Sequence, residues 1–171
     1  MKKTVLNYGL LSGGVSALLM LFMALYIRDD PSRFKNGELF GYTGIILSMV
    51  LVYLGVRAYR DQVVVGTISF GKAFQVGLLI ALISCACYVV AWMLISKTLM
   101  PNFMEQFVTY SLNELKASGA SPEEISRKAA EMEQYKTLYK NPLMTAAVTF
   151  LEPLPVGLLV TLLTAGILGR R

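Results

Sequence analysis

Hydrophobic positions gather in four long runs along the chain, over residues 5–27, 39–56, 74–96 and 143–168. A helix over the first run is about 34 Å long at 1.5 Å per residue, which exceeds a hydrocarbon core of about 30 Å. Because a backbone in lipid must satisfy its own hydrogen bonds, each run is predicted to be a membrane-spanning α-helix. The first run is too long for the apolar part of a signal peptide, so we expect it to be retained.

Small residues recur at helical spacing inside the first run. Gly9, Gly13 and Ala17 lie four residues apart. In lipid, this spacing allows two helix backbones to approach closely. The first helix is therefore predicted to pack tightly against a neighbour along this stripe.

Two polar segments separate the later runs. The short segment Gly66–Phe74 is broken by glycines and hydroxyl side chains and is predicted to be a turn or a short interfacial helix. In the longer segment, residues 100–141, acidic and basic residues alternate while apolar residues keep helical spacing. Ser121, Pro122 and Glu124 there form the pattern of a helix start with a capping box. Residues 100–141 are predicted to form a helical hairpin outside the bilayer core.

The composition agrees with a membrane protein. The chain of 171 residues is 55% hydrophobic and only 16% charged, against about 45–50% and 25% in soluble domains. The predicted fold is all-α: a single membrane domain, residues 1–171, with four transmembrane helices and a hairpin between the third and fourth. The lipid bilayer is the expected partner, and the hairpin is a candidate surface for a second copy or another membrane protein. The alternative is that residues 100–141 form only a solvated spacer between the third and fourth spans.

The charge pattern argues against nucleic-acid binding and indicates an orientation. The net charge is +5, but the basic residues stand at the ends of the apolar runs, which is typical of membrane topology signals. Seven basic residues crowd the end that holds both termini, whereas nine are diluted through the long loops at the other end. We expect cytoplasmic termini and a periplasmic hairpin. The seven are Lys2, Lys3, Arg57, Arg60, Lys72, Arg170 and Arg171.

Candidate chemistry is sparse. Histidine is absent, the spacing of the two cysteines, Cys85 and Cys87, fits no metal site, and no serine has an evident activating base. The sequence predicts no enzyme activity, no catalytic residues, no metal and no cofactor.

One acidic residue lies well inside an apolar run. Glu152 precedes Pro153 and Pro155 in the fourth run, and each proline removes a backbone N–H and breaks the helix. A carboxylate in the bilayer costs roughly 2.5–3.5 kcal/mol, so such residues face the protein interior and often mark ion or proton pathways. The candidate polar site comprises Glu152, Pro153, Pro155 and the tyrosines of the same leaflet, Tyr42 and Tyr88.

Two functions follow from these features. The first is a non-enzymatic protein that acts through helix packing and partner contacts of the hairpin, with Glu152 bonded to a hydroxyl of Tyr42, Ser48 or Tyr88. The alternative is a small transporter or ion- or proton-conducting protein that uses Glu152 at the broken helix.

Five segments together resemble the DUF 4199 family of small bacterial membrane proteins, found mainly in Bacteroidota. They are Tyr59–Asp61, Gly66–Phe74 (GTISFGKAF), Ala117–Ser121 (ASGAS), Tyr139–Leu143 (YKNPL) and Phe150–Leu158 (FLEPLPVGL). The resemblance implies a four-span inner-membrane protein. It brings no activity and no functional residues, because the family is one of unknown function.

Overall fold

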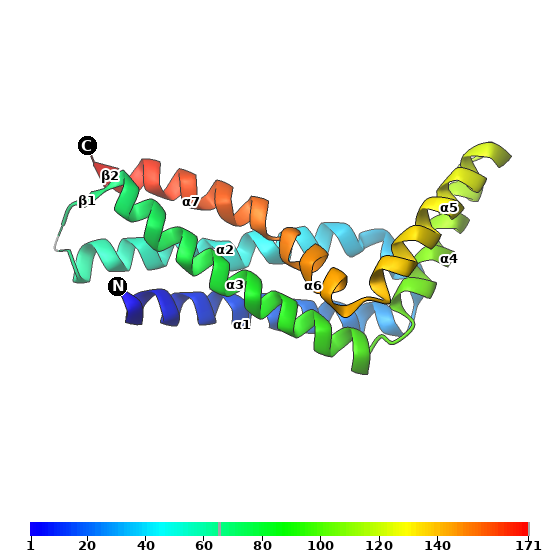
Figure 1. Cartoon of the computed structure of the whole chain (residues 1–171), viewed down its shortest axis with the longest axis horizontal. Coiled ribbons are helices and arrows are strands. Elements are labelled where there is room, and N and C mark those ends of the chain that lie inside the picture. The colour runs from blue at the N-terminus through cyan, green and yellow to red at the C-terminus, as the bar shows by residue number, and fades with distance from the viewer. Residues whose placement is uncertain (65, 171) are drawn as a thin grey trace.

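Four long segments of the computed structural model are apolar enough to span a membrane, as the sequence predicts (Figure 1). The structure describes residues 1–64 and 66–170. The helices α1 (Lys2–Arg28), α2 (Gly37–Gln62) and α3 (Phe70–Thr98) form the first three, and α6 (Pro142–Leu151) with α7 (Leu154–Leu168) forms the fourth. The first three helices extend beyond their apolar runs at both ends, whereas the fourth segment ends with its run at Leu168.

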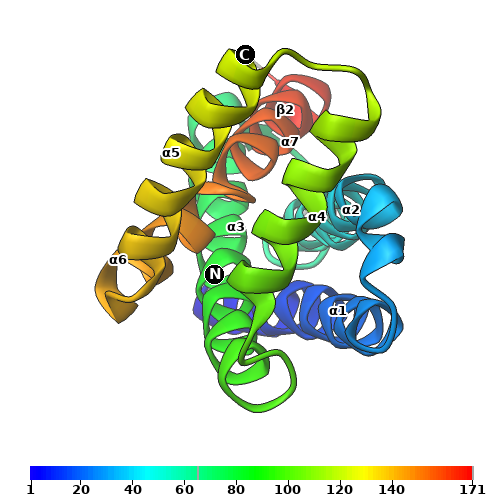
Figure 2. The ribbon, with the colours of Figure 1, turned by 90° about the vertical axis from the view of Figure 1, so that its right-hand side faces the viewer.

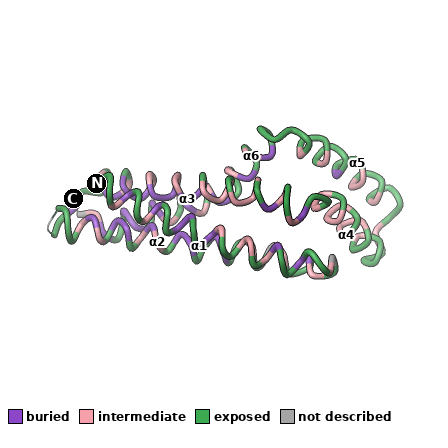
Figure 3. Tube along the Cα trace, turned by 90° about the horizontal axis from the view of Figure 1, so that it is seen from below, coloured by how far each residue is buried: buried purple, intermediate pink, exposed green. Residues whose placement is uncertain are grey.

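The exterior of this bundle is apolar, as a lipid environment requires. Phe22 and Ile167 are each 70% exposed, and Leu18 is 67% exposed. The buried residues lie along the inner sides of the helices (Figure 3). Exposed leucine and phenylalanine side chains at this density are typical of lipid contact rather than of a water-soluble surface.

The helices α1 and α3 approach most closely along the predicted glycine stripe. A Cβ atom at Gly9 would lie 2.8 Å from the Cβ atom of Ile83, and one at Gly13 would overlap the Cβ atom of Cys87. The prediction that small residues allow close approach is therefore confirmed at these two positions. Cys85 is buried among apolar side chains of the bundle core.

Three buried serines join α1, α2 and α3 at the same level. The Ser12 hydroxyl donates to the carbonyl oxygen of Ser48 at 2.8 Å, and its oxygen lies 2.9 Å from the Ser84 hydroxyl. Because Ser12 has one hydroxyl proton, Ser84 is the donor in the second bond. This cluster gives the core a polar contact of fixed geometry between three spans.

The connection between α2 and α3 lies beside the C-terminus. Gly66 has a φ of +114°, and Ile68–Ser69 (β1) pairs in parallel with Gly169–Arg170 (β2). Ser69 caps α3, which begins at Phe70. The turn predicted over Gly66–Phe74 therefore ends at Ser69, and its last five residues belong to α3. Both termini and this connection lie at one end of the bundle (Figure 1).

The opposite end carries a short 3-10 helix, η1 (Pro31–Asn36), and two helices, α4 (Phe103–Ala117) and α5 (Pro122–Tyr139). The helices α4 and α5 pack against each other and project from the bundle (Figures 1 and 2). The capping box is confirmed: the Ser121 hydroxyl accepts from the Glu124 backbone at 3.2 Å, and the Glu124 carboxylate accepts from the Ser121 backbone at 3.0 Å. We call this pair the α4–α5 hairpin.

Candidate functional site

The fourth span is broken at Glu152 and Pro153, which form a turn between α6 and α7. Beyond the break the two halves have different neighbours. The helix α7 packs against both α2 and α3, whereas α6 packs against α3 and reaches α5. The bend therefore places α6 beside α3 and α5 rather than beside α2.

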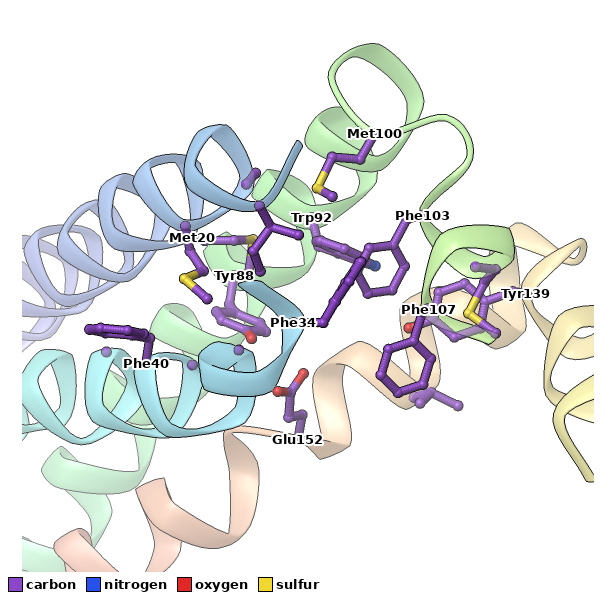
Figure 4. Close-up of a pocket in the computed structure, with 18 of the residues that line it drawn as sticks. Met20, Phe34, Phe40, Tyr88, Trp92, Met100, Phe103, Phe107, Tyr139 and Glu152 are labelled. Carbon is purple, nitrogen blue, oxygen red and sulfur yellow. The ribbon is translucent and has the colours of Figure 1, made fainter. Parts of the chain in front are cut away.

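A pocket of about 640 Å³ lies beside the break, between the bundle and the α4–α5 hairpin (Figure 4). Five of its lining residues are methionines and eight are aromatic. The methionines are Met20, Met23, Met100, Met104 and Met132, and the aromatic residues are Phe34, Phe40, Tyr88, Trp92, Phe103, Phe107, Tyr135 and Tyr139. Methionine side chains adapt their shape and recur at surfaces that accept varied apolar ligands.

The outer wall is an aromatic cluster built from three separate elements. The ring of Phe34, from η1, lies 5.7 Å from that of Phe103 and 5.9 Å from that of Phe107, both from α4. The Trp92 ring, from α3, meets Phe103 edge to face at 4.7 Å. These contacts hold α4 over the pocket, so the apolar face of α4 is packed on the chain's own residues.

Glu152 is the one acidic residue among the described lining residues. Figure 4 shows its carboxylate directed toward the pocket, on the side where the Tyr88 hydroxyl also points. Tyr88 lies one helical turn before Trp92 in α3, so both side chains extend from the same face. Burial raises the pKa of the Tyr139 hydroxyl in α5, and the charge of Glu152 raises it further. Glu152 therefore acts electrostatically on the α4–α5 hairpin.

The structure brings together part of the predicted polar site. Glu152 and Tyr88 line the pocket, and Pro153 is fully buried at the break. Pro155 is exposed in the first turn of α7. Tyr42 is 51% exposed and is not among the described lining residues.

Ser48 is also separate from Glu152. Its hydroxyl donates to the Ile45 carbonyl oxygen at 2.8 Å, and its own carbonyl oxygen accepts from Ser12. Of the three hydroxyl partners suggested by the sequence, only Tyr88 shares the pocket with Glu152.

Sequence reasoning did not identify the aromatic wall as part of the site. The helical spacing of Phe103 and Phe107 indicates an apolar face on α4, but spacing alone does not show what covers it. Phe34 lies in a polar connection between two spans, where no periodicity marks it. Its burial at 7% exposure is the feature that reveals its role.

Together these features define an α-helical, multi-span membrane protein with a pocket at a broken helix. The chain belongs to the family described as "Protein of unknown function (DUF4199)", whose model matches residues 7–170. The resemblance noted from the sequence motifs is thereby confirmed over nearly the whole chain. No curated protein and no solved structure matches it.

Proposed function

We propose that this protein is a non-enzymatic, multi-span protein of the bacterial cytoplasmic membrane that binds a hydrophobic molecule in the pocket beside Glu152. The observation that carries the proposal is the pocket itself, with a volume of about 640 Å³ and a lining of methionine and aromatic side chains. Small-molecule sites generally span about 300–1,000 Å³ and combine an apolar lining with a few polar groups. The pocket meets both criteria.

A non-enzymatic role is supported by the polar groups of the pocket. Its described lining residues offer two serines, one lysine, one glutamate and three tyrosine hydroxyls. Nucleophilic catalysis needs a nucleophile within hydrogen-bond reach of a base. Neither Ser16 nor Ser111 is hydrogen-bonded to Glu152 among the described residues.

The pocket contains its own spectroscopic reporter, because Trp92 is the single tryptophan of the chain. We expect 1-bromododecane, a neutral chain with a heavy-atom quencher, to quench Trp92 fluorescence saturably in lipid nanodiscs. Gly41 lines the pocket, and a Cβ atom there would meet no atom within 4 Å. Gly41→Leu should therefore fill part of the pocket without disturbing the bundle and should weaken the saturable quenching.

Gly166→Leu is the matched control. Gly166 lies in α7, outside the pocket lining, and a Cβ atom there also meets nothing within 4 Å. This variant should quench like the wild type. Quenching that rises linearly with bromododecane, identical in all three proteins, would refute binding in the pocket. Glu152-dependent flux of the bound molecule across proteoliposome membranes would extend binding to transport.

The orientation is part of the same proposal, with the termini in the cytoplasm and the α4–α5 hairpin in the periplasm. Supporting it, Lys72, in the first turn of α3, lies at the same end as both termini (Figure 1), and the connection before α3 is joined to the C-terminus through β1 and β2. Alkaline phosphatase fused within Ser118–Ser121 should be active, and a fusion after Gln62 should be inactive. The reverse pattern would overturn the orientation.

Partner contact through the α4–α5 hairpin is the second candidate function. The observation in its favour is that the tip of the hairpin extends beyond the bundle (Figure 1). A photo-crosslinker at the exposed Lys116 should then give a covalent dimer or a membrane-protein adduct in cells. The same crosslinker at Lys2, at the other end of the bundle, is the control and should give neither.

A further inference from the structure

Two charged side chains, Lys128 and Glu152, are among the described lining residues of the pocket, and one of them has an ionic partner. Lys128, on α5, forms an ion pair with Glu131 at 3.0 Å. Glu152 takes part in none of the ion pairs found among the described residues. Among the described residues, the pocket therefore presents one carboxylate without an ionic partner, on a residue that is itself exposed.

Aromatic rings surround the space in front of this carboxylate. Figure 4 shows Glu152 facing the region occupied by Tyr88, Phe34 and Trp92. The negative face of an aromatic ring attracts cations, most strongly where water is excluded. Groups of aromatic rings recognise quaternary ammonium ligands in this way, and a nearby carboxylate adds a charge of opposite sign.

The helix break adds further negative partial charge. Pro153 and Pro155 lack backbone N–H groups, so the carbonyl groups of Thr149 and Leu151 have no donor four residues ahead. Both carbonyls belong to the last turn of α6, directly before Glu152. A cation near Glu152 is thus favoured by the backbone as well as by the side chain.

The size and lining of the pocket exclude a bare metal ion as the occupant. Hard cations require six or more oxygen ligands to replace their water. The pocket offers the Glu152 carboxylate and a few hydroxyl groups in a volume of about 640 Å³, mostly bounded by methionine and aromatic side chains. An organic cation with an apolar body matches both the charge and the lining.

We propose that the pocket selects organic monocations with a long apolar chain, with the cationic head between Glu152 and the rings of Tyr88, Phe34 and Trp92. This inference rests on the proposed function, which it narrows from any hydrophobic molecule to one chemical class. A neutral chain would leave the carboxylate desolvated without a partner, and an anionic head would be repelled by it.

The test compares three brominated chains that report through the same tryptophan: 12-bromododecyltrimethylammonium, 1-bromododecane and 12-bromododecanoate. Each is titrated into nanodiscs that hold the wild-type protein, with its concentration expressed as a mole fraction of the lipid. We expect the cation to reach half-saturation at about a tenfold lower mole fraction than the neutral chain, a difference equivalent to about 1.4 kcal/mol. The anion should quench more weakly than either.

Glu152→Gln keeps the size of the side chain and removes its charge. In this variant the preference for the cation should fall to about twofold or less, because the cation loses its ionic partner and the neutral chain no longer desolvates a charge, so the neutral chain should bind more tightly than to the wild type. Gel filtration and circular dichroism check that the variant is folded. If it is not, the comparison of the three chains on the wild-type protein still decides the question.

The outcomes separate this inference from the proposed function. Saturable quenching by the neutral chain, with no advantage for the cation, would overturn the inference and leave the pocket as a binding site. Tighter binding of the anion would also overturn it. Loss of saturable quenching with all three chains would overturn both. An advantage for the cation that depends on Glu152 would support both.

Discussion

Gly13 offers a sharp test of how the bundle is packed, because an adjacent glycine serves as its control. A Cβ atom added at Gly13 would overlap the Cβ atom of Cys87 and would lie 2.7 Å from the Cys87 sulfur atom and 3.5 Å from the Cα atom of Ser84. Gly14 faces outward, and a Cβ atom there meets nothing within 4 Å. Gly13→Ala must push α1 and α3 apart, whereas Gly14→Ala leaves their contact unchanged.

The expected magnitude follows from this difference. Overpacking a tight contact costs about 1–3 kcal/mol. Both substitutions raise helix propensity equally, by up to about 1 kcal/mol, so that contribution cancels in the comparison. Gly13→Ala should therefore be less stable than Gly14→Ala by about 1–3 kcal/mol.

The assay is unfolding by sodium dodecyl sulfate in mixed micelles, followed by far-ultraviolet circular dichroism and Trp92 fluorescence. The midpoint of Gly13→Ala should move to a lower detergent fraction, and Cys87→Gly in the same chain should restore part of the loss by removing the opposing Cβ atom. Equal midpoints for Gly13→Ala and Gly14→Ala would show that α1 and α3 do not meet as described.

Three further outcomes follow from local contacts. Ser12→Ala, which removes the hydrogen bonds joining α1 to α2 and α3, should lower the unfolding free energy by about 0.6–1.7 kcal/mol in the same assay; no change would show that the bonds are dispensable. Ser121→Ala should remove the side-chain half of the capping box with Glu124. Hydrogen exchange over the first turn of α5 should then become faster, while exchange in α4 stays unchanged. Hydrogen bonds from Ser32 hold the pKa of Asp30 below its ordinary value of 3.8. The stability that these bonds give η1 is therefore fully present above pH 3.8, and it is lost as the pH falls through the lowered pKa of the folded state. The protection factors of the η1 amides, which are corrected for the intrinsic pH dependence of exchange, should accordingly fall only in that acidic range, and protection that is already lost near neutral pH would contradict this assignment.

Periodicity and length were enough to predict the four spans, the break in the fourth span and the start of α5. Each depends on local rules: the length of a hydrocarbon core, the missing N–H of proline, and the hydrogen bonds of a capping residue. The hydrophobic pattern predicted shorter helices than the structure shows for α2 and α3. The polar residues Arg57–Gln62 and the segment Phe70–Ala73 are helical although they lie outside the apolar runs.

The pocket was not predictable in the same way, because it depends on relative positions of helices. The sequence indicates that the fourth span bends at Glu152, but not that α6 then follows α3 rather than α2. Likewise it places Tyr42 and Tyr88 at similar depth without giving the rotation of α2, which turns Tyr42 away from the pocket lining. Such rotations are determined by packing among several helices rather than by local pattern.

The central claim is that the bend at Glu152 opens a pocket that a hydrophobic molecule occupies. Photolabelling of the protein in native membranes with an aliphatic diazirine, followed by mass-spectrometric mapping of the adducts, tests it most directly. The account predicts adducts on Glu152 and Tyr88 that Gly41→Leu reduces and Gly166→Leu preserves. Labels confined to outward-facing residues such as Phe22 and Ile167, unchanged by Gly41→Leu, would contradict it.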